Sequence, residues 1–268
     1  LSNDDVIKTG VCEIKRTVKI VEDTFRLFDA QKAVIAQESA LRLQSGGEDQ
    51  ACYSLPAYVG GNADVCGVKW SAHGKPQGRD TGKSRIQAAI IINDKDSGVP
   101  LAVMNGTEIG AARTGAVTAA ALVRLAPFEA KKAALCGAGG QAEHQLQAIL
   151  YGLPGVEEVA IWSRGCSKAE DLAARYEKQA CARLYPVQTV DEAVDGADVV
   201  IGATSASSPY LTAKRLESSS LYCHIGFHEI TWEAVSGFSY IVTDTWEEAK
   251  QVSGQSIFRY YRDGLMDE

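Results

Sequence analysis

The chain has 268 residues, of which 46% are hydrophobic and 23% charged, as in an ordinary globular protein. Its net charge of −7 argues against a basic surface that would bind nucleic acid or an anionic membrane. Its seven cysteines include no C-x-x-C pair, so neither a disulfide framework nor a metal site is expected. Because the sequence shows no signal pattern and no apolar run of membrane-spanning length, we expect a cytoplasmic protein.

The region up to residue 107 begins with helical patterns. Residues 2–5 (Ser-Asn-Asp-Asp) form a helix cap. Apolar residues then recur at spacings of three and four, which predicts a helix with one apolar face. The residues of that face are Val18, Val21, Phe25 and Phe28.

Strand patterns follow these helices. Residues 51–60 and 64–70 are short runs rich in β-branched and aromatic residues, which predicts two strands. Residues 86–94 and 99–106 flank a polar turn that ends in glycine, which predicts a β-hairpin. Residues 1–112 are therefore expected to form an N-terminal α+β domain.

The pattern changes at Glu108, where an alanine-rich helix begins that Pro127 ends. Strand and helix patterns then alternate, which predicts a Rossmann-type, doubly wound parallel sheet of the α/β class over residues 113–268. The expected strands are 131–137, 157–164, 184–189, 198–204, 220–226 and 240–245, and the expected helices are 141–152, 167–180 and 190–197. No closing element is expected after these, and a C-terminal segment that returns to the first domain is expected to be absent.

A glycine-rich turn joins the first of these strands to its helix. It matches G-x-G-x-x-A, in which the first glycine makes the tight turn, the second admits the pyrophosphate, and the small last residue lets helix and strand pack closely. Its position after a strand and before a helix predicts a dinucleotide site rather than a plain turn. The cofactor-binding residues are expected to be Gly137, Gly139, Gly140, Gln141 and Ala142.

The end of the second strand indicates which dinucleotide binds. An NAD site usually has Asp or Glu there, whereas this chain has Ser163 and Arg164, with Ser167 close behind. Hydroxyl and guanidinium groups suit a 2′-phosphate, so NADP(H) is preferred, with NAD(H) as the alternative. Thr204 and Ser205, at the end of a later strand, are further candidates for contact with ribose or nicotinamide, or belong to a simple serine-rich loop.

Three basic residues in the first half stand in uncharged or apolar surroundings. They are Arg42, Lys69 and Arg113. A buried cation is costly unless it is paired, and a substrate carboxylate is one suitable partner. A structural ion pair, or a side chain that reaches water, is the alternative for each of them.

Taken together, these motifs resemble the ornithine cyclodeaminase/mu-crystallin family. The resemblance extends over essentially the whole chain, and its motifs stand in the family's order. They are YSLPAYVGG (53–61), GVKW (67–70), the hairpin at 88–106, EIGAARTGAVTAAA (108–121) and LCGAGGQAEHQLQAI (135–149).

The resemblance implies a substrate-binding and dimerisation domain followed by a Rossmann domain. It implies a homodimeric, NAD(P)-dependent oxidoreductase that forms or reduces a C=N bond at the α-carbon of an amino, imino or keto acid, as imine reductases and opine-like dehydrogenases do. It also implies that Arg42, Lys69 and Arg113 hold the substrate carboxylate. Conversion of ornithine to proline and ammonia, or NADPH-dependent binding of a small ligand as in mu-crystallin, are the alternative functions.

One position departs from the family. Where cyclodeaminases carry Asp shortly after a glycine of the fifth strand, this chain has His228, and Glu229 lies one position further on. An imidazole can act as general acid or base, so Lys69 and His228 are the expected catalytic residues and imine reduction is favoured over ornithine cyclisation. The basic loop at 71–85 could hold a second substrate carboxylate through His73, Lys75, Arg79 and Lys83, or could simply be solvated.

Overall fold

The computed structural model divides into two compact units, Leu1–Val117 and Thr118–Glu268. The division falls within the long helix α3 (Thr107–Leu125), in which the boundary expected between residues 112 and 113 also lies. The structure describes residues 1–43, 50–74, 85–244, 246–251 and 253–267.

The first unit begins with two helices. Helix α1 (Asn3–Lys8) has the predicted cap, in which the Asp5 N–H donates to Oγ of Ser2 and the Ser2 N–H donates to the Asp5 carboxylate. Helix α2 (Ile14–Asp29) contains the predicted apolar face, and Val18 on that face is buried. The cap and the apolar spacing thus predicted both helices correctly.

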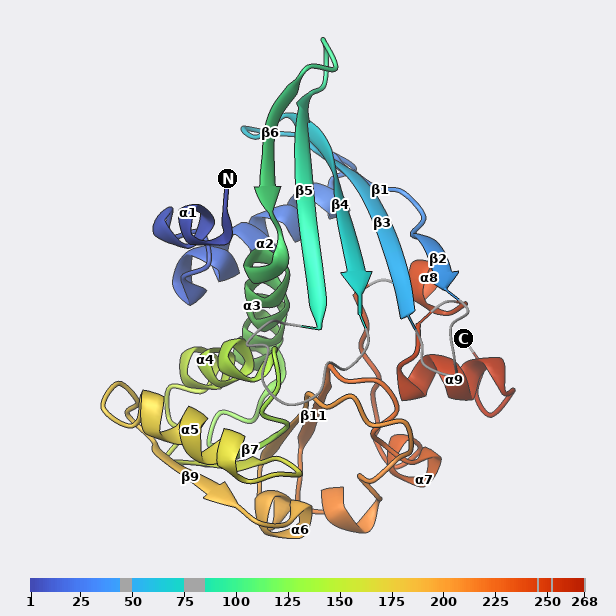
Figure 1. Cartoon of the computed structure of the whole chain (residues 1–268). Coiled ribbons are helices and arrows are strands. Elements are labelled where there is room, and N and C mark those ends of the chain that lie inside the picture. The colour runs from blue at the N-terminus through green and yellow to red at the C-terminus, as the bar shows by residue number, and fades with distance from the viewer. Residues whose placement is uncertain (44–49, 75–84, 245, 252, 268) are drawn as a thin grey trace. The chain divides into compact units, whose positions relative to one another are not determined.

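The sheet of the first unit is antiparallel, and in Figure 1 its long strands lie side by side. The strand order is β1-β3-β4-β5-β6, and β2 pairs with β3 beyond the end of β1. The predicted strands and hairpin are confirmed, whereas the two short edge strands β1 and β2 were not predicted. The bounds are β1 (Ala33–Ile35), β2 (Ser39–Leu43), β3 (Gln50–Val59), β4 (Val65–His73), β5 (Ile86–Asp94) and β6 (Pro100–Asn105).

The second unit contains a parallel sheet with the strand order β11-β10-β7-β8-β9. The chain goes outward from β7 through β8 to β9, then returns to the other side of β7 for β10 and β11. The strand order therefore reverses between β7 and β10, where doubly wound folds bind ligands. The strands are β7 (Lys132–Cys136), β8 (Glu158–Trp162), β9 (Arg183–Val187), β10 (Val199–Gly202) and β11 (Leu221–His224).

Both faces of this sheet are covered. Alternate residues along each strand point to opposite faces, so Leu135 packs in a cluster with Leu146 and Leu172, whereas Cys136 packs in another with Val194. Burial on both faces explains why the strands are continuously apolar, and it confirms the Rossmann-type α/β class. The covering helices are α4 (Ala142–Gly152), α5 (Ser167–Tyr176) and α6 (Val190–Val194).

The strand expected at 240–245 is a wrong prediction. Residues 240–244 are not a strand: Tyr240 is 88% exposed and Val242 is 70% exposed. A β-branched run forms a strand only when a neighbour supplies backbone hydrogen bonds, and among the described strands β11 pairs with β10 alone. Residue 245 lies outside the described residues.

The segment after β10 also contains short helices that the sequence did not predict. The last of them buries Phe258 and Tyr260, although no element was expected there. Whether a segment returns to the first domain stays a prediction. These helices are the 3₁₀ turn η1 (Lys214–Leu216), α7 (Trp232–Val235), α8 (Trp246–Ala249) and α9 (Ser256–Arg262).

Two chain-wide properties bear on function. All seven cysteines are free thiols. In the part of the chain that the structure describes, no helix combines the length and the apolar character needed to cross a membrane.

Candidate active site

The glycine loop lies between β7 and α4, at the point where the strand order reverses. Gly137 has a φ of +126°, and a Cβ there would collide with the carbonyl oxygen of Ala203, the residue after β10. A Cβ at Gly139 would meet no described atom within 4 Å. The first glycine is thus needed for the turn, and the second leaves the backbone open to a ligand, as the sequence motif requires.

Helix α4 begins directly after this loop. Its N-cap is Gln141, whose side chain makes no capping hydrogen bond, and Ala142 is buried. Gln141 therefore supplies no side-chain acceptor to the first turn, in which the N–H of Ala142 donates to the carbonyl of Gly139 at 3.0 Å. The positive end of the helix dipole favours a phosphate at this position.

Three side chains near this loop contain buried polar atoms that find no hydrogen-bond partner within the described residues. They are Oε1 of Gln141, both amide atoms of Gln145, and Oγ of Ser163. An unsatisfied buried polar group costs about 1–3 kcal/mol. Such atoms beside a glycine loop fit a polar ligand such as a dinucleotide, which would supply the missing bonds.

Ser163 and Arg164 lie where the sequence predicts them, directly after β8 and next to the glycine loop. The N–H of Gly137 donates to the carbonyl of Trp162 at 2.8 Å, which places Ser163 beside the loop. Arg164 is exposed, as is Ser167 at the start of α5. Their assignment to cofactor binding stays a prediction.

Thr204 and Ser205 follow β10 on the other side of the reversal. The hydroxyl of Thr204 donates to Glu229 Oε1 at 2.5 Å and accepts from the N–H of Ala206 at 3.2 Å, so it is engaged within the protein. Ser205 is exposed. Of these two hydroxyls, only that of Ser205 is presented to solvent; contact of either with a ligand stays a prediction.

In the first unit, the register of the sheet places predicted site residues on one face. Arg42 of β2 lies opposite Ala51 of β3, which in turn lies opposite His73 of β4, and Lys69 lies opposite Leu55. Side chains alternate between the faces along a strand, so positions 51 and 55 share a face. Arg42, Lys69 and His73 share that face with them.

A carboxylate that the sequence did not single out joins the predicted cations. Burial raises the pKa of Glu38, the residue before β2, and the charges of Lys69, Arg42 and Arg113 oppose that rise. Burial and the charge of Arg113 lower the pKa of Lys69 to about 8, against the attraction of Glu38. The structure therefore brings all three predicted cations together around one acid.

Exposure differs among these cations. Lys69 is half-buried, whereas Arg42 and Arg113 are exposed, which agrees with the alternative of a side chain that reaches water. Strand β2 pairs with β3 alone among the described strands, which leaves Arg42 at the sheet edge. On helix α3, Ala112 and Ala116 are buried, whereas Arg113 lies on the exposed side of the helix.

The basic loop is described only at its two ends. His73 contacts the ring of Tyr53, with 4.8 Å between the ring centroids. Burial lowers the pKa of His73, and the charges of Arg85 and Lys69 lower it further. Lys75, Arg79 and Lys83 lie outside the described residues.

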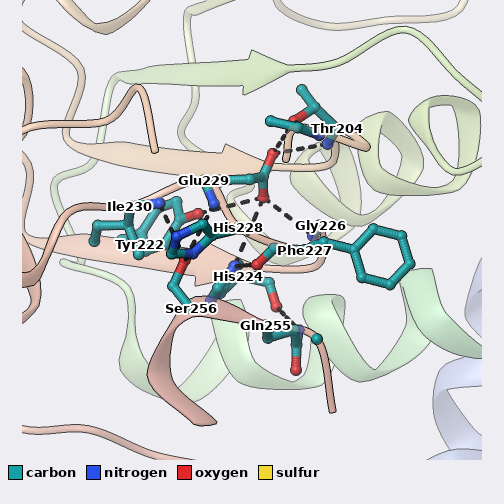
Figure 2. Close-up of polar contacts among 12 residues, drawn as sticks. Thr204, Tyr222, His224, Gly226, Phe227, His228, Glu229, Ile230, Gln255 and Ser256 are labelled. Atoms are coloured by element: carbon teal, nitrogen blue, oxygen red, sulfur yellow. Dashed lines mark hydrogen bonds and ion pairs between the residues drawn. The ribbon is translucent and has the colours of Figure 1, made fainter. Parts of the chain in front are cut away.

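His228 lies after β11 and faces helix α9 (Figure 2). Oγ of Ser256 accepts from the N–H groups of Glu229 and Ile230, and it lies 3.1 Å from Nδ1 of His228. With its lone pairs occupied, the hydroxyl must donate to Nδ1, so we infer that a neutral imidazole carries its proton on Nε2. Burial and the charge of Arg259 lower the pKa of His228, which favours this neutral form.

A family model matches residues 5–239, and its description is the ornithine cyclodeaminase/mu-crystallin family. The chain belongs to this family. The resemblance inferred from the motifs is confirmed, and the family match spans both units described above.

Two curated relatives from the family resemble the chain over much of its length. N-((2S)-2-amino-2-carboxyethyl)-L-glutamate dehydrogenase of Staphylococcus aureus is 26% identical over 201 residues, which are 74% of this chain and 59% of the relative. Delta(1)-pyrroline-2-carboxylate reductase of Bacillus cereus is 26% identical over 183 residues, which are 67% of this chain and 56% of the relative. The chain thus spans less than two thirds of either relative.

A solved structure of the same family fold matches the entire chain. It is Delta(1)-pyrroline-2-carboxylate reductase of Thermococcus litoralis in complex with NADH and L-proline. The TM-score is 0.87 at 26% identity, and the match covers 100% of this chain and 81% of that one. The fold predicted for both halves of the sequence is therefore that of a known member.

Proposed function

We propose that the protein is an NAD(P)H-dependent oxidoreductase that forms or reduces a C=N bond at the α-carbon of an amino or imino acid. The observation that carries the proposal is the cluster of Arg42, Lys69 and Arg113 around Glu38, in a chain whose second unit has a dinucleotide-type glycine loop. The names of the relatives, a dehydrogenase and two reductases of pyrroline-2-carboxylate, support it.

The charges of the cluster suit an amino or imino acid. Three cations favour the substrate α-carboxylate, which a guanidinium can hold through two parallel hydrogen bonds. The carboxylate of Glu38 favours the positively charged nitrogen of an iminium or ammonium group. A substrate with both charges on one carbon would match both halves of the cluster.

The second unit would hold the cofactor through the glycine loop, the start of α4, and the unpartnered atoms of Gln141 and Ser163. When bound, a reduced nicotinamide supplies a hydride to the substrate α-carbon. Reduction of C=N also requires a proton at the nitrogen. Lys69, whose pKa is about 8, is the candidate to deliver that proton from its ammonium group. His228 is the candidate to stabilise developing charge, through a hydrogen bond from its Nε2–H.

The direct test is the oxidation of NADPH and NADH by the purified protein with a panel of substrates. The panel contains cyclic imino acids and mixtures of α-keto acids with ammonia or amino acids. We expect loss of the reduced-cofactor absorbance with at least one imino acid or keto acid–amine pair. L-Ornithine with oxidised cofactor, followed by proline detection, tests cyclodeamination and is expected to give no product because His228 replaces the family's aspartate.

Two outcomes of this assay would contradict the proposal. Tight binding of the reduced cofactor without turnover of any panel member would favour a ligand-binding protein of the mu-crystallin kind. Formation of proline from ornithine would favour the cyclodeaminase. The Lys69→Ala variant is the control, because it should lose turnover and keep cofactor affinity: Lys69 is in the first unit and the glycine loop in the second.

For the cofactor, we propose that NADP(H) is preferred. Exposed Arg164 and the hydroxyls of Ser163 and Ser167 follow β8, and no carboxylate lies among residues 163–169.

We further propose a homodimer, because the exposed strand β6 presents Leu101 (58% exposed) and Val103 (57% exposed) to solvent in a single chain. Seven free thiols support a reducing, cytoplasmic location.

A further inference from the structure

Glu229, next to His228, is a carboxylate that the mechanism above does not use. Its side chain is 0% exposed, at the carboxyl ends of β10 and β11 (Figure 2). Oε1 accepts from the backbone N–H of Thr204 at 2.8 Å, and Oε2 accepts from the backbone N–H of Gly226 at 3.1 Å. The carboxylate thus ties together the loops that follow these two strands.

Hydroxyl groups complete its surroundings. Oε1 also accepts from Thr204 Oγ1 at 2.5 Å and from the Tyr210 hydroxyl at 3.0 Å, and Oε2 accepts from the Tyr222 hydroxyl at 3.4 Å. Each carboxyl oxygen faces a backbone N–H, which can only donate, so neither oxygen is suited to carry a proton. Burial raises the pKa of Glu229, and these donors oppose the rise, so they favour the charged form.

No cation neutralises this charge in the region that the structure describes. The basic group within ion-pair distance is His224, whose Nε2 lies 3.9 Å from Oε2. Burial lowers the pKa of His224 to about 4, and its Nε2–H donates to the carbonyl of Phe227 at 2.8 Å, so the ring is neutral at physiological pH. Glu229 is therefore a buried negative charge held by dipoles alone.

This charge lies close to the glycine loop within the same unit. A Cβ at Gly202, the last residue of β10, would collide with the Glu229 carboxylate, and a Cβ at Gly137 would contact Ala203 and the methyl group of Thr204. Thr204 thus lies next to both the carboxylate, to which it donates, and the glycine loop. The Glu229 carboxylate and the glycine loop both flank the point where the strand order reverses, which is where a dinucleotide binds in such sheets.

We propose that Glu229 sets the preference of the site between the two redox states of the nicotinamide cofactor, by strengthening the binding of the oxidised form relative to the reduced form. The inference rests on the proposed function. The oxidised nicotinamide ring carries a positive charge and the reduced ring is neutral, whereas the phosphate charges are the same in both. Any repulsion between Glu229 and the phosphates therefore cancels in the ratio of the two affinities, and the attraction for the ring remains.

The test is the Glu229→Gln variant, which keeps the side-chain shape and the Oε1 acceptor but removes the charge. Dissociation constants for the oxidised and reduced cofactor are measured on the same preparation, by calorimetry and by fluorescence of the reduced form. We expect the ratio of the oxidised to the reduced dissociation constant to rise about tenfold, the effect of one charge at about 10 Å in a medium of dielectric constant about 20. Circular dichroism and the thermal midpoint establish that the variant is folded.

The matched control is Tyr222→Phe, which removes a hydroxyl from the same network without changing the charge. It is expected to leave the ratio within about twofold of wild type, whatever its effect on each affinity. A purely structural role of Glu229 would weaken both forms equally in Glu229→Gln. An unchanged ratio in the folded variant would therefore overturn the inference.

A second variant covers the case in which Glu229→Gln does not fold. His224→Lys places an ammonium group beside the carboxylate and leaves its five donors in place, so it cancels the charge by pairing. The ratio should again rise, and no change would again contradict the inference. If the wild-type protein binds neither form, the proposed function itself fails; if it binds both and the ratio does not respond, only the role of Glu229 fails.

Discussion

Lys69 combines partial burial with a neighbouring positive charge, and both lower its pKa to about 8, from the ordinary value of 10.5. The protonated ammonium group attracts a substrate carboxylate, and the neutral amine does not. Attraction is therefore full well below pH 8 and is lost as the pH rises through the folded-state pKa of about 8. This sign is the reverse of that expected for an acidic group, whose attraction for a cation increases with pH.

The pH profile of kcat/KM tests this assignment, because that quantity reports the ionisations of the free enzyme. We expect log(kcat/KM) to fall by about one unit per pH unit above about pH 8 when the wild-type protein acts on a carboxylate substrate. The matched variant is Lys69→Arg, whose guanidinium stays protonated. Its activity should be lower, but without the alkaline decline; a decline at the same pH in both proteins would assign the ionisation to another group.

Arg164 allows a test of cofactor preference at a single exposed residue. Arg164→Asp should weaken NADPH binding by about ten- to hundredfold, the range for a lost charge-assisted contact, and leave NADH binding nearly unchanged. The measurement is a pair of fluorescence titrations. Lys178→Asp makes the same change of charge just beyond the C-terminal end of α5 and should alter neither affinity. If both variants weakened NADPH binding equally, the effect would come from the overall electrostatic field of the protein and not from a contact between Arg164 and the phosphate.

At the scale of the elements, the β7–α4 connection depends on one backbone conformation. Gly137→Ala would place a Cβ against the Ala203 carbonyl at a φ of +126°. We expect the free energy of unfolding to fall by about 1–3 kcal/mol and cofactor binding to be lost. Denaturant unfolding measures the first effect and fluorescence titration the second.

Gly155→Ala is the control for this change. A Cβ at Gly155 would meet no described atom within 4 Å, and its φ lies outside the left-handed region, so stability and binding should stay near wild type. Wild-type stability and affinity in Gly137→Ala would show that the loop adjusts easily. The strained turn would then not be what shapes the site.

The elements that could be predicted from sequence are those with local signals. The apolar spacing of α2, the hairpin of β5 and β6, and the glycine loop each have their defining residues within a short window. The strand expected at 240–245 had the same kind of signal and failed, since a strand also needs a partner at the sheet edge, and partners are decided by tertiary structure. The edge strands β1 and β2 were missed for the complementary reason: they are short and mostly exposed.

Site residues divide in the same way. The predicted cations and the glycine loop follow from local pattern and from the family resemblance. Glu38 and Glu229 were not predicted as parts of the candidate site, because the sequence around each does not show which residues will lie near it. Glu38 comes close to Lys69 through the pairing of strands in the first sheet. Glu229 comes close to Thr204 because β10 and β11 are neighbours in the second sheet. A buried acid beside a sheet end can be recognised only once the sheet is assembled.

At the scale of the whole molecule, the proposed function would divide two chemical tasks between the two units. The first unit is an antiparallel sheet with exposed Arg42 and half-buried Lys69, and it holds the charges that we propose for substrate binding. The second unit is a parallel sheet covered on both faces, and it holds the glycine loop and the buried carboxylate that we propose for the cofactor. Each unit has its own hydrogen-bonded sheet, so substitutions in one are expected to leave the secondary structure of the other unchanged.

The hydroxyl of Ser163, which finds no partner among the described residues, has a consequence for the lifetime of the protein in a cell. A buried polar atom without a partner lowers the stability of the ligand-free state, and a nucleotide that satisfies it raises stability in proportion to the logarithm of its concentration. Proteases degrade the unfolded fraction, which is larger when the site is empty. The abundance of the protein would then follow the supply of its cofactor, without any dedicated regulator.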